Sequence, residues 1–158
     1  MLALGGAGFL VWQYALKESM TREPVTNQQA LAQSAIGEVI DKAEESVSKN
    51  DYASAYALID AEIEKTTDNS VKANLISSKA SIAVEEKNLD KALDLSLAAY
   101  DVYPSNVTAQ RVADKYAILS DKIKALEYYR LAIQLTGEDE SINYVRYYET
   151  KIAELEQQ

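Results

Sequence analysis

Three pairs of alanines, each pair 12 residues apart, constrain the fold of this 158-residue chain more than any other feature. The pairs are Ala43 and Ala55, Ala80 and Ala92, and Ala113 and Ala125. Two antiparallel helices approach to roughly 8 Å only where small side chains face each other. Twelve residues carry the chain along one helix, round a turn and back to the same level. The pattern therefore predicts three successive helical hairpins, offset by 37 and then 33 residues.

Short polar segments separate the predicted helices from about residue 28 onward. Each segment contains Asn, Asp, Ser or Gly, which suit helix caps and tight turns. The segments are 49–51, 66–70, 87–90, 103–106, 119–121 and 136–139. No alternation of apolar and polar residues indicates a strand, and Gly and Pro are scarce, with 5 and 2 residues. These signals predict an all-α fold with seven helices after residue 27.

The order of residues within each hairpin resembles the tetratricopeptide repeat (TPR) family. Small residues mark the close approach, a larger residue follows one turn later, then another alanine, and the middle unit closes on Pro104. Ile59 and Tyr129 hold the larger position and are expected to fill the gap to the next pair. The resemblance covers about residues 36–137. It implies a right-handed helical-hairpin solenoid of three TPR-like pairs. The departures from the family pattern are Glu62, Thr67, Ser96 and a first offset that is three residues too long.

The last predicted helix has one apolar stripe along an otherwise polar surface. The stripe consists of Tyr144, Val145, Tyr148, Ile152 and Leu155. Such a helix is expected to cap the array by covering the last pair.

The chain has 11 Tyr residues, and most are expected in the core: Tyr100, Tyr116, Tyr129, Tyr144 and Tyr148 lie on faces that should pack. Tyr128 and Tyr147 are expected to be more exposed, which makes them candidates for an interface.

The TPR resemblance implies a protein that binds partner proteins or peptides along a concave face lined by the first helix of each pair. By register, the residues expected on this face are Ile40, Glu44, Val47, Asn74, Ser77, Ser81, Val107, Gln110 and Asp114. Family members that bind the C-terminal carboxylate of a peptide need Lys, Arg and Asn on this concave face. This chain is expected to present Glu44, Ser77, Ser81 and Asp114 instead, which favours a neutral or basic partner segment. The alternative is that these positions are ordinary solvated surface.

Composition argues against several other classes of function. The chain has no Cys and no His, so disulfides, thiolate nucleophiles, the usual zinc sites and histidine bases are excluded. Its 25 acidic residues outnumber 16 basic ones, for a net charge of −9. Without a basic cluster, nucleic-acid binding is not expected. Adjacent carboxylates such as Glu44 and Glu45 point about 100° apart on a helix. We therefore expect no catalytic residues, no cofactor and no metal.

An apolar segment, residues 1–16, precedes a polar linker at 17–27 and the helical domain at 28–158. Sixteen helical residues span about 24 Å, less than the ~30 Å hydrocarbon core. However, Trp12, Tyr14 and Lys17 match a membrane boundary, and the segment lacks the basic start and cleavage site of a leader. We expect a membrane anchor, with the helical domain outside the cytoplasm. An uncleaved leader, a buried first helix, or a longer native segment containing Met1 are the alternatives.

These observations together predict a non-catalytic scaffold or adaptor. It would be tethered at a membrane and would bind a partner protein or peptide on its concave TPR-like face. The alternative is a soluble cytoplasmic TPR adaptor or co-chaperone with a hydrophobic N-terminal helix. An enzyme or enzyme subunit is a further rival, and the residue inventory offers it no reactive centre.

Overall fold

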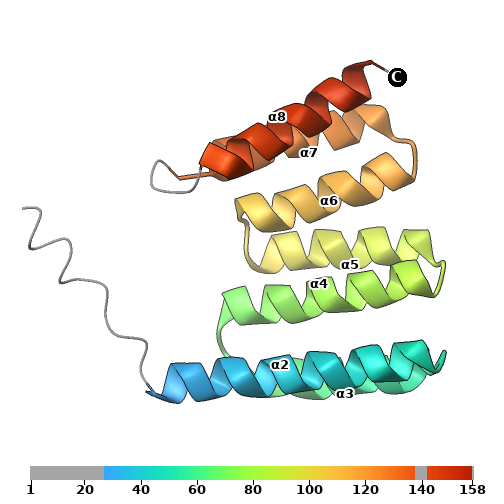
Figure 1. The fold of residues 1–158 in the computed structure, drawn as a ribbon, viewed down its shortest axis with the longest axis vertical. Helices are drawn as coiled ribbons and strands as arrows, with labels where there is room; N and C mark the ends of the chain where they lie inside the picture. The colour runs from blue at the N-terminus through green and yellow to red at the C-terminus, as the bar shows by residue number, and fades with distance from the viewer. Residues whose placement is uncertain (1–26, 138–141, 158) are drawn as a thin grey trace, which may run out of the picture. The chain divides into compact units, whose positions relative to one another are not determined.

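The computed structural model describes residues 27–137 and 142–157, with side chains from residue 36 onward. All regular secondary structure in these residues is helical (Figure 1). The helices are α2 (Asn27–Ser48), α3 (Tyr52–Lys65), α4 (Asn69–Glu85), α5 (Leu89–Val102), α6 (Asn106–Ile118), α7 (Lys122–Leu135) and α8 (Ile142–Glu156). Each of the first five predicted turn segments overlaps the junction between two of them, and the described residues of the sixth, 136 and 137, follow the end of α7. The all-α prediction is confirmed.

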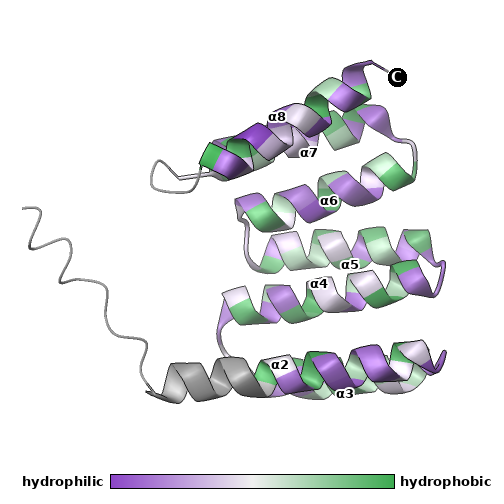
Figure 2. Ribbon diagram, viewed as in Figure 1, coloured by the Kyte–Doolittle hydropathy of each residue, from purple (hydrophilic) through white to green (hydrophobic). Residues whose placement is uncertain are grey.

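The chain divides into two units at Gly37, and the packing described below belongs to the second unit, Glu38–Gln158. The hydrophobic helix expected at residues 1–16 lies outside the described residues, as does the expected linker up to residue 26. Among the described residues, no helix is both long and apolar enough to cross a membrane. Figure 2 shows polar and apolar residues mixed along each coloured helix, which is typical of helices with one buried face.

Within Glu38–Gln158, each helix from α3 onward packs against the helix that follows it in the chain. Successive helices run in opposite directions (Figure 1). In addition, α4 contacts α6, and residues of α2, α3 and α4 line a common groove. The first helices of neighbouring hairpins therefore lie side by side and can present one face together.

The paired alanines lie at the predicted close approaches. All six are at most 2% exposed: Ala43, Ala55, Ala80, Ala92, Ala113 and Ala125. The residue one turn after each second alanine is also buried, and it is Ile59, Ser96 or Tyr129. The buried Ser96 hydroxyl donates a hydrogen bond to the Ala92 carbonyl at 2.8 Å, which satisfies a polar group that would otherwise be costly in the core.

Three tight turns close the hairpins in the same way. Asn50, Lys87 and Ser120 adopt positive φ angles of 59°, 62° and 63°. In each turn the following residue donates its N–H back to a carbonyl five residues earlier, as in a Schellman motif. That following residue also caps the next helix: it is Asp51, Asn88 or Asp121, and its side chain accepts from the backbone N–H three residues on. The turns recur at the 37- and 33-residue offsets of the alanine pairs.

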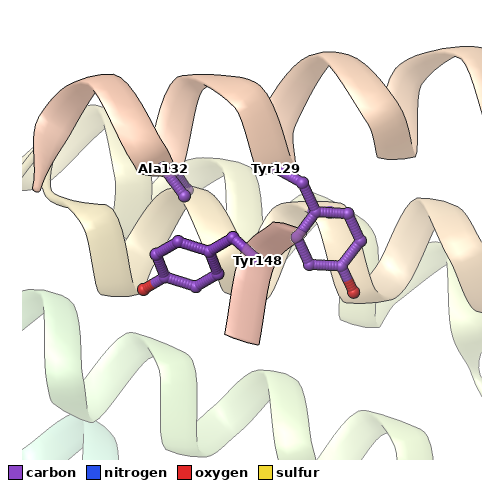
Figure 3. Close-up of a cluster of buried hydrophobic side chains, with 5 residues drawn as sticks. Tyr129, Ala132 and Tyr148 are labelled. Atoms are coloured by element: carbon purple, nitrogen blue, oxygen red, sulfur yellow. The ribbon is translucent and has the colours of Figure 1, made fainter. Parts of the chain in front are cut away.

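The last helix is fixed mainly by Tyr148, which is fully buried. Its ring belongs to a cluster with the small residues Ala109, Ala113 and Ala132 and with Tyr129. Figure 3 shows the Tyr148 ring beneath α7, beside Ala132 and Tyr129. Ile152 and Leu155 pack against the same cluster. These contacts explain how α8 covers the side of the last hairpin, in agreement with the apolar stripe in the sequence.

The expectation that Tyr144 lies in the core is wrong, because its side chain is 44% exposed. Tyr148 already fills the space over the alanines of α6 and α7, so Tyr144 stacks on the Tyr148 ring at 6.4 Å between centroids. The other tyrosines expected in the core behave differently. Tyr116, Tyr129 and Tyr148 are buried, and Tyr100 packs partly buried against the core clusters.

Candidate functional site

Two grooves bring together most of the residues expected on the binding face. The first groove, between α2 and α4, has a volume of about 300 Å³. It is lined by Ile40, Ala43, Glu44, Val47, Ile59, Ser78, Ser81, Ile82 and Glu85. The expected residues Ile40, Glu44, Val47 and Ser81 all belong to it. We call it the α2–α4 groove.

The floor of the α2–α4 groove is apolar and well packed. Ala43, Ile59 and Ile82 are at most 6% exposed, while Ile40 and Val47 are half-buried. Ile59 lies one helical turn beyond the buried Ala55 on α3 and lines the groove together with Ala43 of α2. A shallow apolar floor with a polar rim is the usual form of a binding surface on a protein.

The rim of the α2–α4 groove carries two exposed carboxylates, Glu44 on α2 and Glu85 on α4. Neither forms an ion pair with a Lys or Arg among the described residues. The rim serines donate to carbonyls of their own helix: Ser78 to Asn74 at 3.2 Å and Ser81 to Ser77 at 3.3 Å. Both hydroxyls keep lone pairs with which to accept hydrogen bonds.

Ser77 does not lie on the exposed face as expected. Its side chain is only 4% exposed, and its hydroxyl donates to the Ala73 carbonyl at 2.8 Å. The reason is its place on α4, which has neighbouring hairpins on both sides, so that a small side chain at this position is covered. Ser77 is a packing residue, and the expectation of an exposed position is wrong.

Between the two grooves, α4 and α6 are joined by a polar contact that sequence reasoning missed. Arg111 on α6 donates from Nη1 to the Asn74 side-chain oxygen at 3.3 Å. Burial lowers the pKa of Arg111, and the nearby Asp114 carboxylate opposes this shift. Burial likewise lowers the pKa of Lys115, one turn later. The residues expected on this face include no basic one, whereas the structure has Arg111 beside Asn74.

The second groove lies between α6 and α8 and has a volume of about 350 Å³; we call it the α6–α8 groove. Its lining residues are Asp114, Ala117, Ile118, Tyr129, Tyr147, Lys151, Glu154 and Leu155. A neighbouring hollow of about 600 Å³ is lined by Gln110, Asn143, Tyr144 and Tyr147. The expected residues Gln110, Asp114 and Tyr147 thus lie together, and Tyr147 is 39% exposed, in agreement with its expected surface position.

The charged groups of the α6–α8 groove are paired within the chain. Asp114 accepts hydrogen bonds from the Tyr129 hydroxyl and from Gln110, the latter at 3.4 Å. Burial and the hydrogen bond to Asp114 raise the pKa of Tyr129 far above its usual range. Lys151 pairs with Glu154 at 2.8 Å and lies 5.8 Å from the centre of the Tyr147 ring. This groove is polar, and its charged side chains have hydrogen-bond or ion-pair partners within the chain.

Tyr128 is less available than expected. It is half-buried. Its ring packs edge-on against Tyr100, with ring centroids 5.9 Å apart, and lies tilted against the Tyr116 ring at 5.7 Å. Burial raises its pKa. Tyr128 therefore helps to hold α7 on the hairpin before it, and the expectation that it is an exposed interface residue is not supported by its packing.

Comparisons with known proteins do not assign a family. No family model matches the sequence, and no curated protein matches it significantly. Within the part of the chain that the structure describes, no group of three or more His, Cys, Asp or Glu residues is placed to hold a metal ion. The α2–α4 groove is the candidate site because of its buried apolar floor and its exposed rim carboxylates.

Proposed function

We propose that this chain is a non-catalytic scaffold or adaptor that holds a partner protein or peptide near a membrane. In this proposal α2–α7 form three TPR-like pairs of a right-handed solenoid, and α8 is its cap. The recurrence of one turn geometry at Asn50, Lys87 and Ser120 supports a repeat. So does the packing of each helix from α3 onward on the next in the chain, which is typical of repeat proteins.

The observation that carries the proposal is the α2–α4 groove. It combines a buried apolar floor with rim carboxylates that form no ion pair with a Lys or Arg in the part of the chain that the structure describes. Such a surface suits the binding of another polypeptide, because apolar burial provides affinity and rim charges provide selectivity. The full sequence has no Cys or His nucleophile or base, which makes a catalytic use of the groove the weaker proposal.

Site-specific photocrosslinking tests whether this face binds a partner. A photoreactive amino acid replaces Ser81, which is exposed at the groove rim, in full-length chain produced in its native cells. The matched control carries the same amino acid at Asp94, an exposed position on α5 outside the groove. We expect one or a few discrete crosslinked species from position 81 and none of them from position 94. Identical patterns from both positions would contradict a specific binding face.

The proposed tether needs its own test, because residues 1–16 lie outside the described residues. Full-length chain is mixed with phosphatidylcholine vesicles and floated on a density gradient. We expect it to float with the vesicles and the variant Leu10→Lys/Val11→Lys to remain below, since two charges within the apolar segment oppose insertion. Lack of flotation by the unmodified chain would favour a soluble adaptor. Protease accessibility in native membrane preparations would test the proposed position of the helical domain outside the cytoplasm.

A further inference from the structure

Two adjacent pairs of glutamates border the α2–α4 groove, and in each pair the two carboxylates differ. Glu45 is bound to Lys49 at 2.6 Å, and Glu86 accepts from Lys91 at 3.2 Å and from the Tyr56 hydroxyl at 2.9 Å. Their neighbours Glu44 and Glu85 line the groove instead. Neither of these two has a lysine or arginine partner in the described part of the chain. Among the described residues, the two carboxylates outside the groove lining have lysine partners, and the two in the lining have none.

We propose that the α2–α4 groove binds a basic–apolar segment of a partner protein. Aliphatic side chains of this segment lie on the floor formed by Ile40, Ile59 and Ile82, and flanking Lys or Arg residues contact Glu44 and Glu85. This assignment rests on the proposed function and specifies the chemistry of the partner. It follows from charge complementarity, since a rim of two unpaired carboxylates favours cations and disfavours acidic segments.

The size and composition of the groove fit this occupant. Its volume of about 300 Å³ is at the lower end of the roughly 300–1,000 Å³ of ligand pockets, which suits a few aliphatic side chains. Five of the nine lining residues are aliphatic, so affinity is expected to come from apolar contact. The exposed carboxylates add a smaller, salt-sensitive contribution. A purely basic peptide or a purely apolar one should therefore bind more weakly than a segment with both features.

The experiment uses full-length chain in detergent micelles and a fluorescent 12-residue peptide with two central Leu residues, two Lys on each side and a Gly/Ser background. Two matched peptides replace the Leu residues with Ser or the Lys residues with Glu. Binding is measured by fluorescence anisotropy at low and high salt. The test variant is Glu44→Lys/Glu85→Lys. The control variant Glu64→Lys/Glu127→Lys makes the same change in net charge at exposed glutamates outside the groove.

We expect the Leu/Lys peptide to bind best to the unmodified chain and to weaken as salt increases. The test variant should lose at least about tenfold in affinity, from roughly threefold or more for each exposed charge pair, and the control less than about twofold. The test variant should also prefer the Leu/Glu peptide. A third variant, Ser81→Trp, places a large ring at the rim and should abolish binding with an unchanged helical circular dichroism spectrum.

Several results would overturn the inference. Equal losses in the test and control variants would mean that only net charge matters, and equal binding of the Ser-substituted peptide would remove the role of the apolar floor. Preference for the acidic peptide, or self-association that blocks the groove at micromolar concentration, would identify a different occupant. If no probe binds but position 81 still crosslinks specifically, this inference fails and the proposed function stands. If the crosslinking also fails, both fail.

Discussion

The α2–α4 and α6–α8 grooves occupy comparable places in the hairpins. They differ in the polarity of their lining and in whether their carboxylates have partners. Each groove has an acidic residue directly after the first alanine of its pair: Glu44 in the first groove and Asp114 in the second. Asp114 accepts hydrogen bonds from Tyr129 and Gln110, whereas the Glu44 side chain has neither a hydrogen bond nor an ion pair in the described residues. One turn after the second alanine, Ile59 provides an apolar floor where Tyr129 provides a hydroxyl.

This difference shows how one helical framework can carry both a binding surface and a structural end. In the α6–α8 groove, tyrosine side chains and an ion pair provide partners for the polar groups within the chain. These contacts hold the last helix in place. In the α2–α4 groove, aliphatic and small side chains close the floor, and the rim carboxylates have no ion-pair partner among the residues that the structure describes. The stability of the array should therefore depend most on the α8 end, and binding on the α2 end.

Replacement of Tyr148 by Ala should have the largest effect on stability. Tyr148 is fully buried over the alanines of α6 and α7, and removal of a buried aromatic ring costs about 4 kcal/mol. Urea denaturation followed by circular dichroism measures the change. Tyr144→Ala, at a 44% exposed position on the same helix, is the matched control and should cost less than about 1 kcal/mol. Similar losses in both variants would show that α8 is not held by Tyr148.

The next largest effect is expected at the floor of the α2–α4 groove. Ile59→Ala removes a side chain that is 1% exposed and should lower the free energy of unfolding by about 3 kcal/mol. Ile123→Ala, at a position 81% exposed, serves as the control and should change it by less than about 0.5 kcal/mol. A negligible cost at Ile59 would mean that the groove has no packed floor, and the contrast between the grooves would disappear.

The sequence was sufficient to predict the helices and the close contacts between them. The alanine pairs and polar turn segments are local signals, and local backbone and packing rules determine what they form. Ile40, Glu44 and Ser81 were expected on one face and line one groove, because helical periodicity fixes which residues share a face. That this face binds a partner stays a prediction. Within the described residues, therefore, the all-α architecture and the shared face of Ile40, Glu44 and Ser81 follow from residue spacing along the sequence.

What the sequence could not predict depends on neighbours and on side-chain length. Ser77 has the same register as Ile40 and Gln110, yet it is buried because α4 lies between other hairpins. Arg111 was missed because its long side chain reaches Asn74 on another helix. Its spacing of four residues from Lys115 was a signal that both lie on one face of α6. Tyr128 could not be placed without knowing the tyrosines packed against it.

The hydrogen bond within the α6–α8 groove should contribute less than its packing. Tyr129→Phe removes the donor to Asp114 and should cost about 1 kcal/mol at pH 7, because the bond is charged but only partly buried. The folded-state pKa of Tyr129 is raised above the usual value of about 10. Its contribution is therefore complete below about pH 10 and is lost as pH rises further.

Urea denaturation at pH 7 and between about pH 9 and 11 measures both parts of this prediction. The difference between the unmodified chain and Tyr129→Phe should shrink as the pH increases. Tyr103→Phe changes a tyrosine that is 44% exposed and should alter stability little at pH 7. A constant difference across the alkaline range would mean that the hydroxyl of Tyr129 does not couple to Asp114.

The smallest expected effect compares the hairpin turns beside the two grooves. Ser120, between α6 and α7, and Asn50, between α2 and α3, both have a left-handed backbone, with φ of 63° and 59°. This conformation costs most non-glycine residues about 1 kcal/mol, whereas Asn tolerates it through its short polar side chain. Ser120→Gly should therefore raise the free energy of unfolding by about 0.5–1 kcal/mol. Asn50→Gly should change it by only a few tenths. Equal gains in the two variants would mean that the strain resides in the turn geometry and does not depend on the residue that adopts it.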